Sequence, residues 1–441
     1  MKTLKKIEKF LEKGEDFPRE PVPASARKPW WSIGLVWIGV YICVPSIIEG
    51  LILIGGLPFR EAILAEIVGF IIFLTLMFIQ GSIGTKTGLS TYMMAKESFG
   101  LWGSHLVSII VAICGFGWFA IQARAFGEST VALIGLGNAA LLSLLGGLLM
   151  MITALLGYRA IEFLSRPSAV YTFVAMIYLA VKSSLKAPES FVEAVSKAPI
   201  GEPISFAAAI SMIVGGMAMG AVISPDVMRF SRAVKDNFKA LFIFVLPVAI
   251  IQPIAAMIIG SCVGSTELGL VMISAGGILG FLLVFLGAWT SNDNNLYSTS
   301  LALSEVIPKV KRWEVAVVLG IVASFLSALI SLEDYGYIMY FFGSLTIPVI
   351  GIMVTDYYFL SRLGLKKRTA LERKERVNPI AATALIIGGS LEASLDFGII
   401  PNPYSIPPPL ITIAVTCFIY IIGMKLKQMD ACKICARSKK R

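Results

Sequence analysis

The chain has 441 residues, of which 56% are hydrophobic and 15% are charged, and its mean hydropathy is +0.81. This composition excludes an ordinary soluble globule and predicts an integral membrane protein, and the long apolar runs favour helices over a β-barrel because each can cross about 30 Å of hydrocarbon as a helix. The formal net charge is +10, but the basic residues lie in loops and tails, so they indicate membrane topology and no nucleic-acid partner.

The amino-terminal tail, residues 1–28, is polar and charged and has no apolar core, so we expect no cleavable signal peptide. The first span, about 32–54, contains Pro45 near its middle. Proline removes a helical hydrogen bond, which predicts a break around Ile42 to Ser46. Carbonyl groups freed by such a break could coordinate an ion.

Glu49 follows the predicted break and is an acid inside an apolar run. Ionisable residues inside a membrane segment are candidates for gating or proton transfer, although Glu49 could equally pair with a neighbouring helix or lie near the outer mouth. His105, the only histidine, begins a helix, and we expect it to be structural rather than a proton relay.

A second span is expected at about 61–79, followed by a Gly- and Thr-rich connection at 81–92 that is too polar for lipid and too irregular for a helix. The third span, about 104–134, carries Trp118 and Gln122. Residues four apart share one helical face. The indole of Trp118 could stack on a planar heteroaromatic ligand, and the amide of Gln122 could hydrogen-bond to the edge of its ring. The alternative is that the tryptophan is structural and the glutamine bonds to a helix.

The fourth and fifth spans, about 139–156 and 169–181, are unremarkable in composition. The sixth, about 204–223, contains Gly215, Gly216 and Gly220. These glycines predict a second broken helix, and paired broken helices point to a binding site at the membrane midplane. The alternative is that the glycines only allow helices to pack closely.

The remaining spans are expected at about 240–263, 270–291, 315–332, 337–358, 380–393 and 408–423, which makes about twelve. The apolar run near 269–288 ends in a cluster of hydroxyl, amide and carboxyl groups. Such a cluster is costly in lipid unless something binds to it. We therefore expect Thr290 and Ser291 to hold a cation and Asn292 to face a small polar substrate.

The charge distribution predicts that both termini are cytoplasmic. With the amino terminus inside, the basic loops at 86–96, 159–166, 229–239, 309–312 and 362–376 fall on the cytoplasmic side, together with the tail 425–441. Cys432 and Cys435 form a lone CxxC in that tail, which is weak evidence for a metal site.

Several motifs resemble those of one transporter family. They are Pro21-Val22-Pro23 with Ser25 to Lys28, Gly84 to Thr91, Gly117-Trp118-Phe119, Asp226 to Arg232 and Trp289 to Tyr297. Their order and spacing resemble the nucleobase:cation symporter family, and within it the cytosine permeases.

The resemblance implies a LeuT-type fold within a transporter domain at 29–424. Inverted five-helix repeats would occupy about 32–181 and 204–358, and two extra helices about 380–423. It further implies sodium-driven uptake of a nucleobase. In that scheme Trp118 stacks on the base and Asn292 bonds its edge. Sodium binds the hydroxyls of Thr290 and Ser291 and the carbonyls of Gly287, Gly39 and Ile42.

The chain also departs from the family pattern. Gly115 stands where cytosine permeases have a glutamine, and Gln122 stands where hydantoin-type relatives place theirs. Met217, with Met219 nearby, replaces an aromatic expected on the sixth span, and methionine packs more adaptably on a ring. Ser291 replaces a threonine and keeps the hydroxyl. The ring therefore stays open between cytosine, another pyrimidine such as a thiamine precursor, a purine and a hydantoin.

We expect a symporter of the cytoplasmic membrane, with a nucleobase, sodium and lipid as its partners, sodium as coupling ion in place of a cofactor, and no obligatory protein partner. Proton coupling through Glu49 is the nearest alternative. An intramembrane enzyme has little support, because the sequence has no HExxH, GxSxG or paired intramembrane aspartates. A channel is disfavoured because broken helices with an aromatic and amide pocket suit an occluding site.

Overall fold

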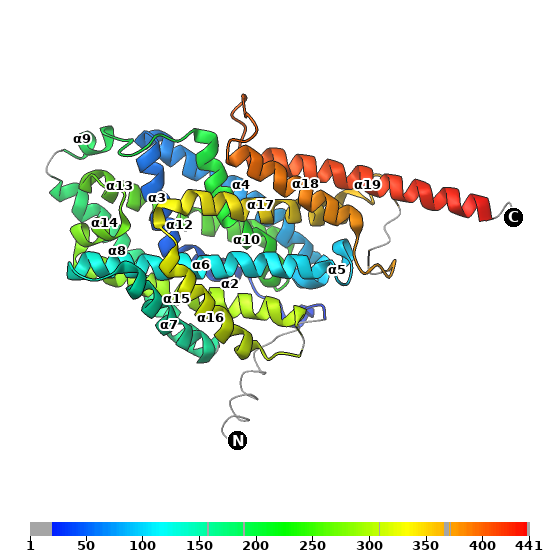
Figure 1. Ribbon diagram of the computed structural model, residues 1–441, viewed down its shortest axis with the longest axis horizontal. Coiled ribbons are helices and arrows are strands. Elements are labelled where there is room, and N and C mark those ends of the chain that lie inside the picture. The colour runs from blue at the N-terminus through cyan, green and yellow to red at the C-terminus, as the bar shows by residue number, and fades with distance from the viewer. Residues whose placement is uncertain are drawn as a thin grey trace, which may run out of the picture.

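The computed structural model describes residues 20–438 except positions 157, 188–189, 308, 366–369 and 371. Within that part of the chain the structure is built of helices, without a β-strand (Figure 1). Seven of these helices are long and apolar enough to cross a membrane, and one bent pair raises the number to eight.

The long helices follow the expected order of spans. They are α2 (Trp30–Tyr41) with α3 (Val44–Gly56), α4 (Phe59–Thr87), α6 (Ser104–Ile134), α7 (Ala139–Leu156), α8 (Tyr158–Lys186), α10 (Phe206–Met228), the run α11 (Val234–Phe238) through a π-helical turn (Lys239–Val245) and α12 (Leu246–Ala249) to α13 (Ile251–Val263), α15 (Ile278–Val306), α16 (Arg312–Leu329), α17 (Tyr335–Val354) with a π-helical turn (Thr355–Phe359), α18 (Pro379–Asp396) and α19 (Pro408–Ser438). Short helices α5 (Thr91–Phe99), α9 (Phe191–Ser196) and α14 (Leu268–Gly276) connect some of them.

The predicted break in the first span is confirmed. Helices α2 and α3 meet at an angle of 62°, and Pro45 lies in the first turn of α3, where its missing N–H costs no helical bond. Other helices satisfy the carbonyls freed at the break. Gln252 Nε2 donates to the Cys43 carbonyl at 2.8 Å, and the Tyr335 hydroxyl donates to the Pro45 carbonyl at 3.4 Å.

The predicted break in the sixth span is wrong, because α10 is continuous through its glycines. These glycines instead allow close packing. A Cβ at Gly215 would lie 2.7 Å from the Met339 carbonyl oxygen, and one at Gly220 would lie 2.8 Å from the Tyr41 hydroxyl. The alternative reading of the glycines as packing residues therefore holds.

Several predicted boundaries are also wrong, among them those of the second and eighth spans. Helix α4 continues to Thr87 through residues expected to be irregular, and ends at Gly88 with φ of +73°. The eighth span does not run from residue 270, because α14 ends at Gly276, and Gly277, with φ of +55°, separates it from α15. The polar cluster near residue 290 therefore lies in the middle of a long helix and not at its end.

Three of the sequence motifs meet at one end of the bundle. The Arg27 guanidinium donates to the carbonyls of Thr85 and Ser231 at 3.0 and 3.1 Å. The Thr91 N–H donates to Asp226 Oδ1 at 2.9 Å. These contacts fasten the amino-terminal approach to the ends of α4 and α10, so these motifs are structural rather than part of a ligand pocket.

Helix α10 packs between α4 and α17, and α6 packs along α15. Helices α18 and α19 lie side by side against α17 at the upper right of Figure 1, where α19 projects beyond the bundle. The two extra helices therefore contact the core through α17 and α10.

Candidate functional site

A cavity of about 240 Å³ lies beside the break between α2 and α3. Residues from α2, α6, α10 and α15 line it together with the break itself. They include the predicted substrate residues Trp118, Gln122, Met217 and Met219, and the predicted ion residues Gly39 and Ser291. The structure thus brings together residues that are far apart in the sequence.

Trp118 and Gln122 face the cavity from adjacent turns of α6, as their spacing predicts. The Trp118 side chain is 8% exposed. Its ring packs against Phe342 at 5.6 Å and, edge on, against Tyr335 at 6.1 Å between ring centroids. Aromatic neighbours on α17 therefore hold the indole in place, as a stacking platform requires.

Asn292 is fully buried and is not among the residues that line the cavity. Its Nδ2 donates to the Phe119 carbonyl at 3.1 Å, and its Oδ1 accepts from Gln122 Nε2 at 3.4 Å. The Gln122 Oε1 atom is buried and has no hydrogen-bond partner among the residues that the structure describes. The structure thus places Asn292 behind Gln122, where it orients the Gln122 amide.

The side chains that α15 presents to the cavity are Ser291, Asn294, Asn295 and Ser298. The sequence analysis missed the last three. These three residues lie three, four and seven positions after Ser291, and such positions share one face of a continuous helix. This spacing could have predicted them from the sequence. The expected helix end near residue 291 hid this pattern.

Gly115 does not line the cavity. A Cβ at this position would lie 2.1 Å from the Thr299 hydroxyl, so the glycine allows α6 to approach α15. Met217 and Met219, in contrast, both line the cavity from α10 and are 7% and 6% exposed. The flexible thioethers form the wall where the family resemblance places an aromatic ring.

The predicted ion residues lie around the same break. Gly287 of α15 faces Val44, the first residue of α3, because a Cβ added at Gly287 would lie 3.2 Å from Val44 Cγ2. The Thr290 hydroxyl donates to the Leu286 carbonyl at 2.9 Å, and Ile42 is the residue at which α2 ends. These groups offer only oxygen atoms, which hard cations prefer. Among the described residues no group of three or more His, Cys, Asp or Glu side chains could hold a metal ion.

Glu49 has a partner that the sequence analysis did not identify. Glu49 of α3 and Glu66 of α4 are 3% and 1% exposed, and their carboxyl groups lie close enough to interact. Each also has one buried oxygen without a partner. Two buried carboxyl groups placed side by side favour sharing a proton over carrying two like charges. The structure thus places Glu49 beside an acid on a neighbouring helix.

Two minor predictions concern residues away from the cavity. His105 lies in the first turn of α6, as expected. The side chains of Cys432 and Cys435 lie outside the described part of the structure.

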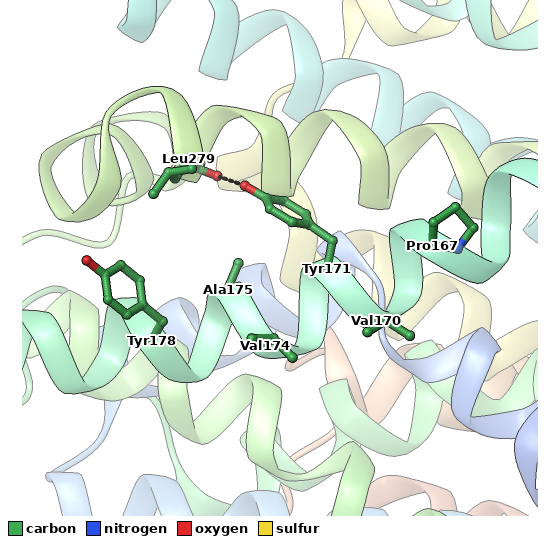
Figure 2. A pocket seen from close by; sticks show the side chains of 7 residues that line it. All are labelled: Pro167, Val170, Tyr171, Val174, Ala175, Tyr178 and Leu279. Carbon is green, nitrogen blue, oxygen red and sulfur yellow. Dashed lines mark hydrogen bonds between the residues drawn. The ribbon is translucent and has the colours of Figure 1, made fainter.

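A larger hollow of about 600 Å³ lies between α8 and α15 (Figure 2). Its walls are apolar, and Val170 and Val174 are 65% and 58% exposed. The Tyr171 hydroxyl that crosses it already donates to the Leu279 carbonyl at 3.0 Å. Such a surface suits lipid chains and offers no polar groups for a soluble substrate, so the smaller cavity is the better candidate.

Residues 21–403 match the family model described as a permease for cytosine/purines, uracil, thiamine and allantoin. The chain belongs to this permease family. It is therefore a multi-pass membrane permease and not an enzyme. The cytosine permease of Escherichia coli strain K12 is 28% identical to it over 389 residues, which are 86% of this chain and 89% of that protein. The hydantoin permease of Microbacterium maritypicum is 24% identical over 363 residues, which are 75% of this chain and 73% of that protein.

Solved structures agree on the fold. The inward-facing conformation of Mhp1 superimposes with a TM-score of 0.79 at 19% identity and covers 93% of both chains. Mhp1 in a closed conformation with bromovinylhydantoin bound gives a TM-score of 0.75 at 20% identity, covering 93% of this chain and 95% of that one. The predicted LeuT-type fold of this permease is thereby confirmed.

Proposed function

We propose that this permease is a secondary active transporter that takes up a nucleobase, cytosine or a related pyrimidine, together with sodium across the cytoplasmic membrane. The observation that carries the proposal is that Trp118 and Gln122 line one small cavity beside a broken helix. An indole face and a free amide oxygen match the flat ring and the polar edge of a nucleobase. The cytosine permease relatives support the same substrate class.

Sodium would bind where α15 meets the break. The Tyr41 carbonyl already accepts from Ser46 Oγ at 2.8 Å, and the Cys43 carbonyl accepts from Gln252. Following the family resemblance, we assign the backbone ligands to Gly39, Ile42 and Gly287, and the hydroxyl ligands to Thr290 and Ser291. In this structure the Thr290 hydroxyl faces the carbonyls of Leu286 and Gly287, at 2.9 and 3.4 Å. An ion bound between α15 and α2 would fix the two walls of the cavity, so sodium and base would raise each other's affinity.

Replacing Ser291 with alanine tests the ion site. The substitution removes one proposed sodium ligand without filling the cavity, so the sodium concentration needed for half-maximal uptake should rise several-fold while the order of preferred bases stays the same. Uptake by proteoliposomes at graded sodium concentrations measures this shift. Ser298→Ala is the matched control, because Ser298 lines the cavity on the same helix but lies two turns further along α15. A changed base preference with an unchanged sodium requirement would assign Ser291 to the substrate instead.

Proton-coupled transport of another heterocycle, such as a hydroxymethylpyrimidine-type thiamine precursor, a purine or a hydantoin, is the second candidate. The buried pair of Glu49 and Glu66 favours it, since two adjacent carboxyl groups could share a proton beside the helix that forms one side of the break. The pair also lies near Tyr335, whose ring contacts Trp118.

Replacing Glu49 with glutamine separates the two candidates. If protons drive transport, Glu49→Gln should abolish uptake driven by a pH gradient, because the amide cannot release a proton. If sodium drives transport, sodium-dependent uptake should continue in the variant. Uptake by the variant is measured under a pH gradient alone and under a sodium gradient alone, with Glu333→Gln, a change at an exposed glutamate, as control.

The proposed orientation places both termini in the cytoplasm. The basic loops at 229–239 and 362–376 and the tail 425–441 would then share the cytoplasmic side, as the positive-inside rule favours. Labelling of single cysteines introduced at exposed positions Lys197 and Arg232 in intact cells tests this, with labelling expected only at Lys197.

A further inference from the structure

A second group of buried carboxyl groups lies on α18, away from the cavity. Glu392 is fully buried, and neither of its carboxylate oxygens has a hydrogen-bond partner in the described part of the chain. Asp396 follows one helical turn later, at the end of α18. Its Oδ1 accepts from the Ser211 hydroxyl at 2.6 Å, while its Oδ2 is buried without a partner. Three carboxylate oxygens thus lack partners in a small volume.

The groups around Glu392 supply no positive charge. Among the described residues, the titratable groups that face this region are Asp396 on the same helix and, beside Asp396, Tyr340 of α17. Helix α10 contributes the Ser211 hydroxyl, and α19 contributes the Thr412 hydroxyl. Thr412 is fully buried, and its hydroxyl lies beside Glu392 without a hydrogen bond of normal geometry.

An ionised carboxylate at this position would be costly. Burying an unpaired charge costs several kcal/mol, and here no described residue offsets it. The packing is also tight, since a Cβ on Gly343 would lie 2.9 Å from Glu392 Oε1. A proton neutralises the carboxyl group without needing a cavity, whereas a metal ion requires space for several ligands.

The position of Glu392 connects it to the wall of the cavity. A Cβ on Gly343, which would lie beside Glu392 Oε1, would also lie 3.0 Å from Gly215 Cα. The Glu392 carboxyl group therefore lies next to the crossing of α10 and α17. Gly216 and Met217, the next residues of α10, line the cavity. A charge on Glu392 would draw water toward this crossing and loosen the contact between α10 and α17.

We propose that Glu392 is a proton-binding site, with Asp396 as its route to water, and that its occupancy controls how α10 packs against α17. Asp396 is half-buried and is followed by the exposed Phe397, so it lies closer to solvent than Glu392 does, at the end of α18. In the proposed orientation this end faces the outside. The site itself requires no assumption about the substrate, and only its effect on transport rests on the proposed function.

The test is thermal unfolding of the purified full-length protein over a range of pH at constant sodium and without substrate. Glu392 holds its proton in the folded state and releases it on unfolding, so the wild-type protein should lose stability as pH rises. One linked proton changes the unfolding equilibrium by up to about tenfold per pH unit. Glu392→Gln should reduce this slope by up to that amount, and Glu333→Gln should keep the wild-type slope. A wild-type slope in Glu392→Gln would overturn the proposal.

Two further measurements keep the proposal testable if Glu392→Gln folds poorly. Asp396→Asn removes the neighbouring like charge, so Glu392 should release its proton more readily and the loss of stability should be complete at a lower pH. Hydrogen exchange of α10 in the wild-type protein should rise with pH beyond the intrinsic rate, while α7 serves as an internal reference. No shift in Asp396→Asn, or parallel exchange of α10 and α7 at all pH values, would contradict the proposed control of α10.

Discussion

Replacing Trp118 with alanine should weaken substrate binding by about 1–3 kcal/mol, the range seen when bases lose a stacking partner. This corresponds to roughly a 5- to 150-fold loss in affinity. The loss is expected because the indole lines the cavity and is held by Phe342 and Tyr335, so the platform is already ordered before the ring arrives. Equilibrium binding of the preferred ring to purified protein measures the change.

The control for this experiment is Trp313→Ala. Trp313 is 46% exposed on α16 and does not line the cavity, so its loss should leave affinity unchanged. Trp118→Phe should recover part of the affinity, because a smaller ring still stacks. Normal affinity in Trp118→Ala, with the protein folded, would mean that the substrate binds elsewhere.

Replacing Asn292 with alanine should reduce affinity by a similar amount, although Asn292 lies behind the cavity. The substitution leaves Gln122 Nε2 and the Phe119 carbonyl without this partner, and an unpaired buried polar group costs the protein about 1–3 kcal/mol of stability. Freed from Asn292, the Gln122 amide would no longer present its oxygen to the ring in one orientation. Binding measurements on Asn292→Ala report this loss.

A double-mutant cycle distinguishes this indirect role from direct contact. If Asn292 acts through Gln122, the effects of Asn292→Ala and Gln122→Ala should be strongly non-additive, with the double variant little worse than Gln122→Ala alone. Additive losses would show that Asn292 reaches the substrate by itself, as the family resemblance first suggested.

The sequence predicted the features that depend on local chemistry. Pro45 cannot continue a helix, so the break beside it could be located from the sequence. Trp118 and Gln122 are four residues apart, so their common face followed from helical geometry. The motifs were sufficient to suggest the family and with it the fold.

The features that depend on packing between helices could not be predicted in the same way. Glycine permits a break but does not require one, so Gly215 could not show whether α10 is broken or closely packed. The partner of Glu49 lies on α4, and no sequence spacing indicates that Glu66 faces it. The position of Asn292 behind Gln122 could not be anticipated, because the expected helix end near residue 291 obscured which side chains of α15 face the cavity.

The most direct test of the proposed function is thermal stabilisation of the purified protein by a panel of pyrimidines, purines and hydantoins, each in sodium and in potassium. A ligand that binds only the folded state raises the apparent stability, so a rise in melting temperature identifies binding. We predict that cytosine or a related pyrimidine raises the melting temperature in sodium and has little effect in potassium. Equal stabilisation in both salts would contradict sodium coupling, and no stabilisation by any ring in the panel would contradict nucleobase transport itself.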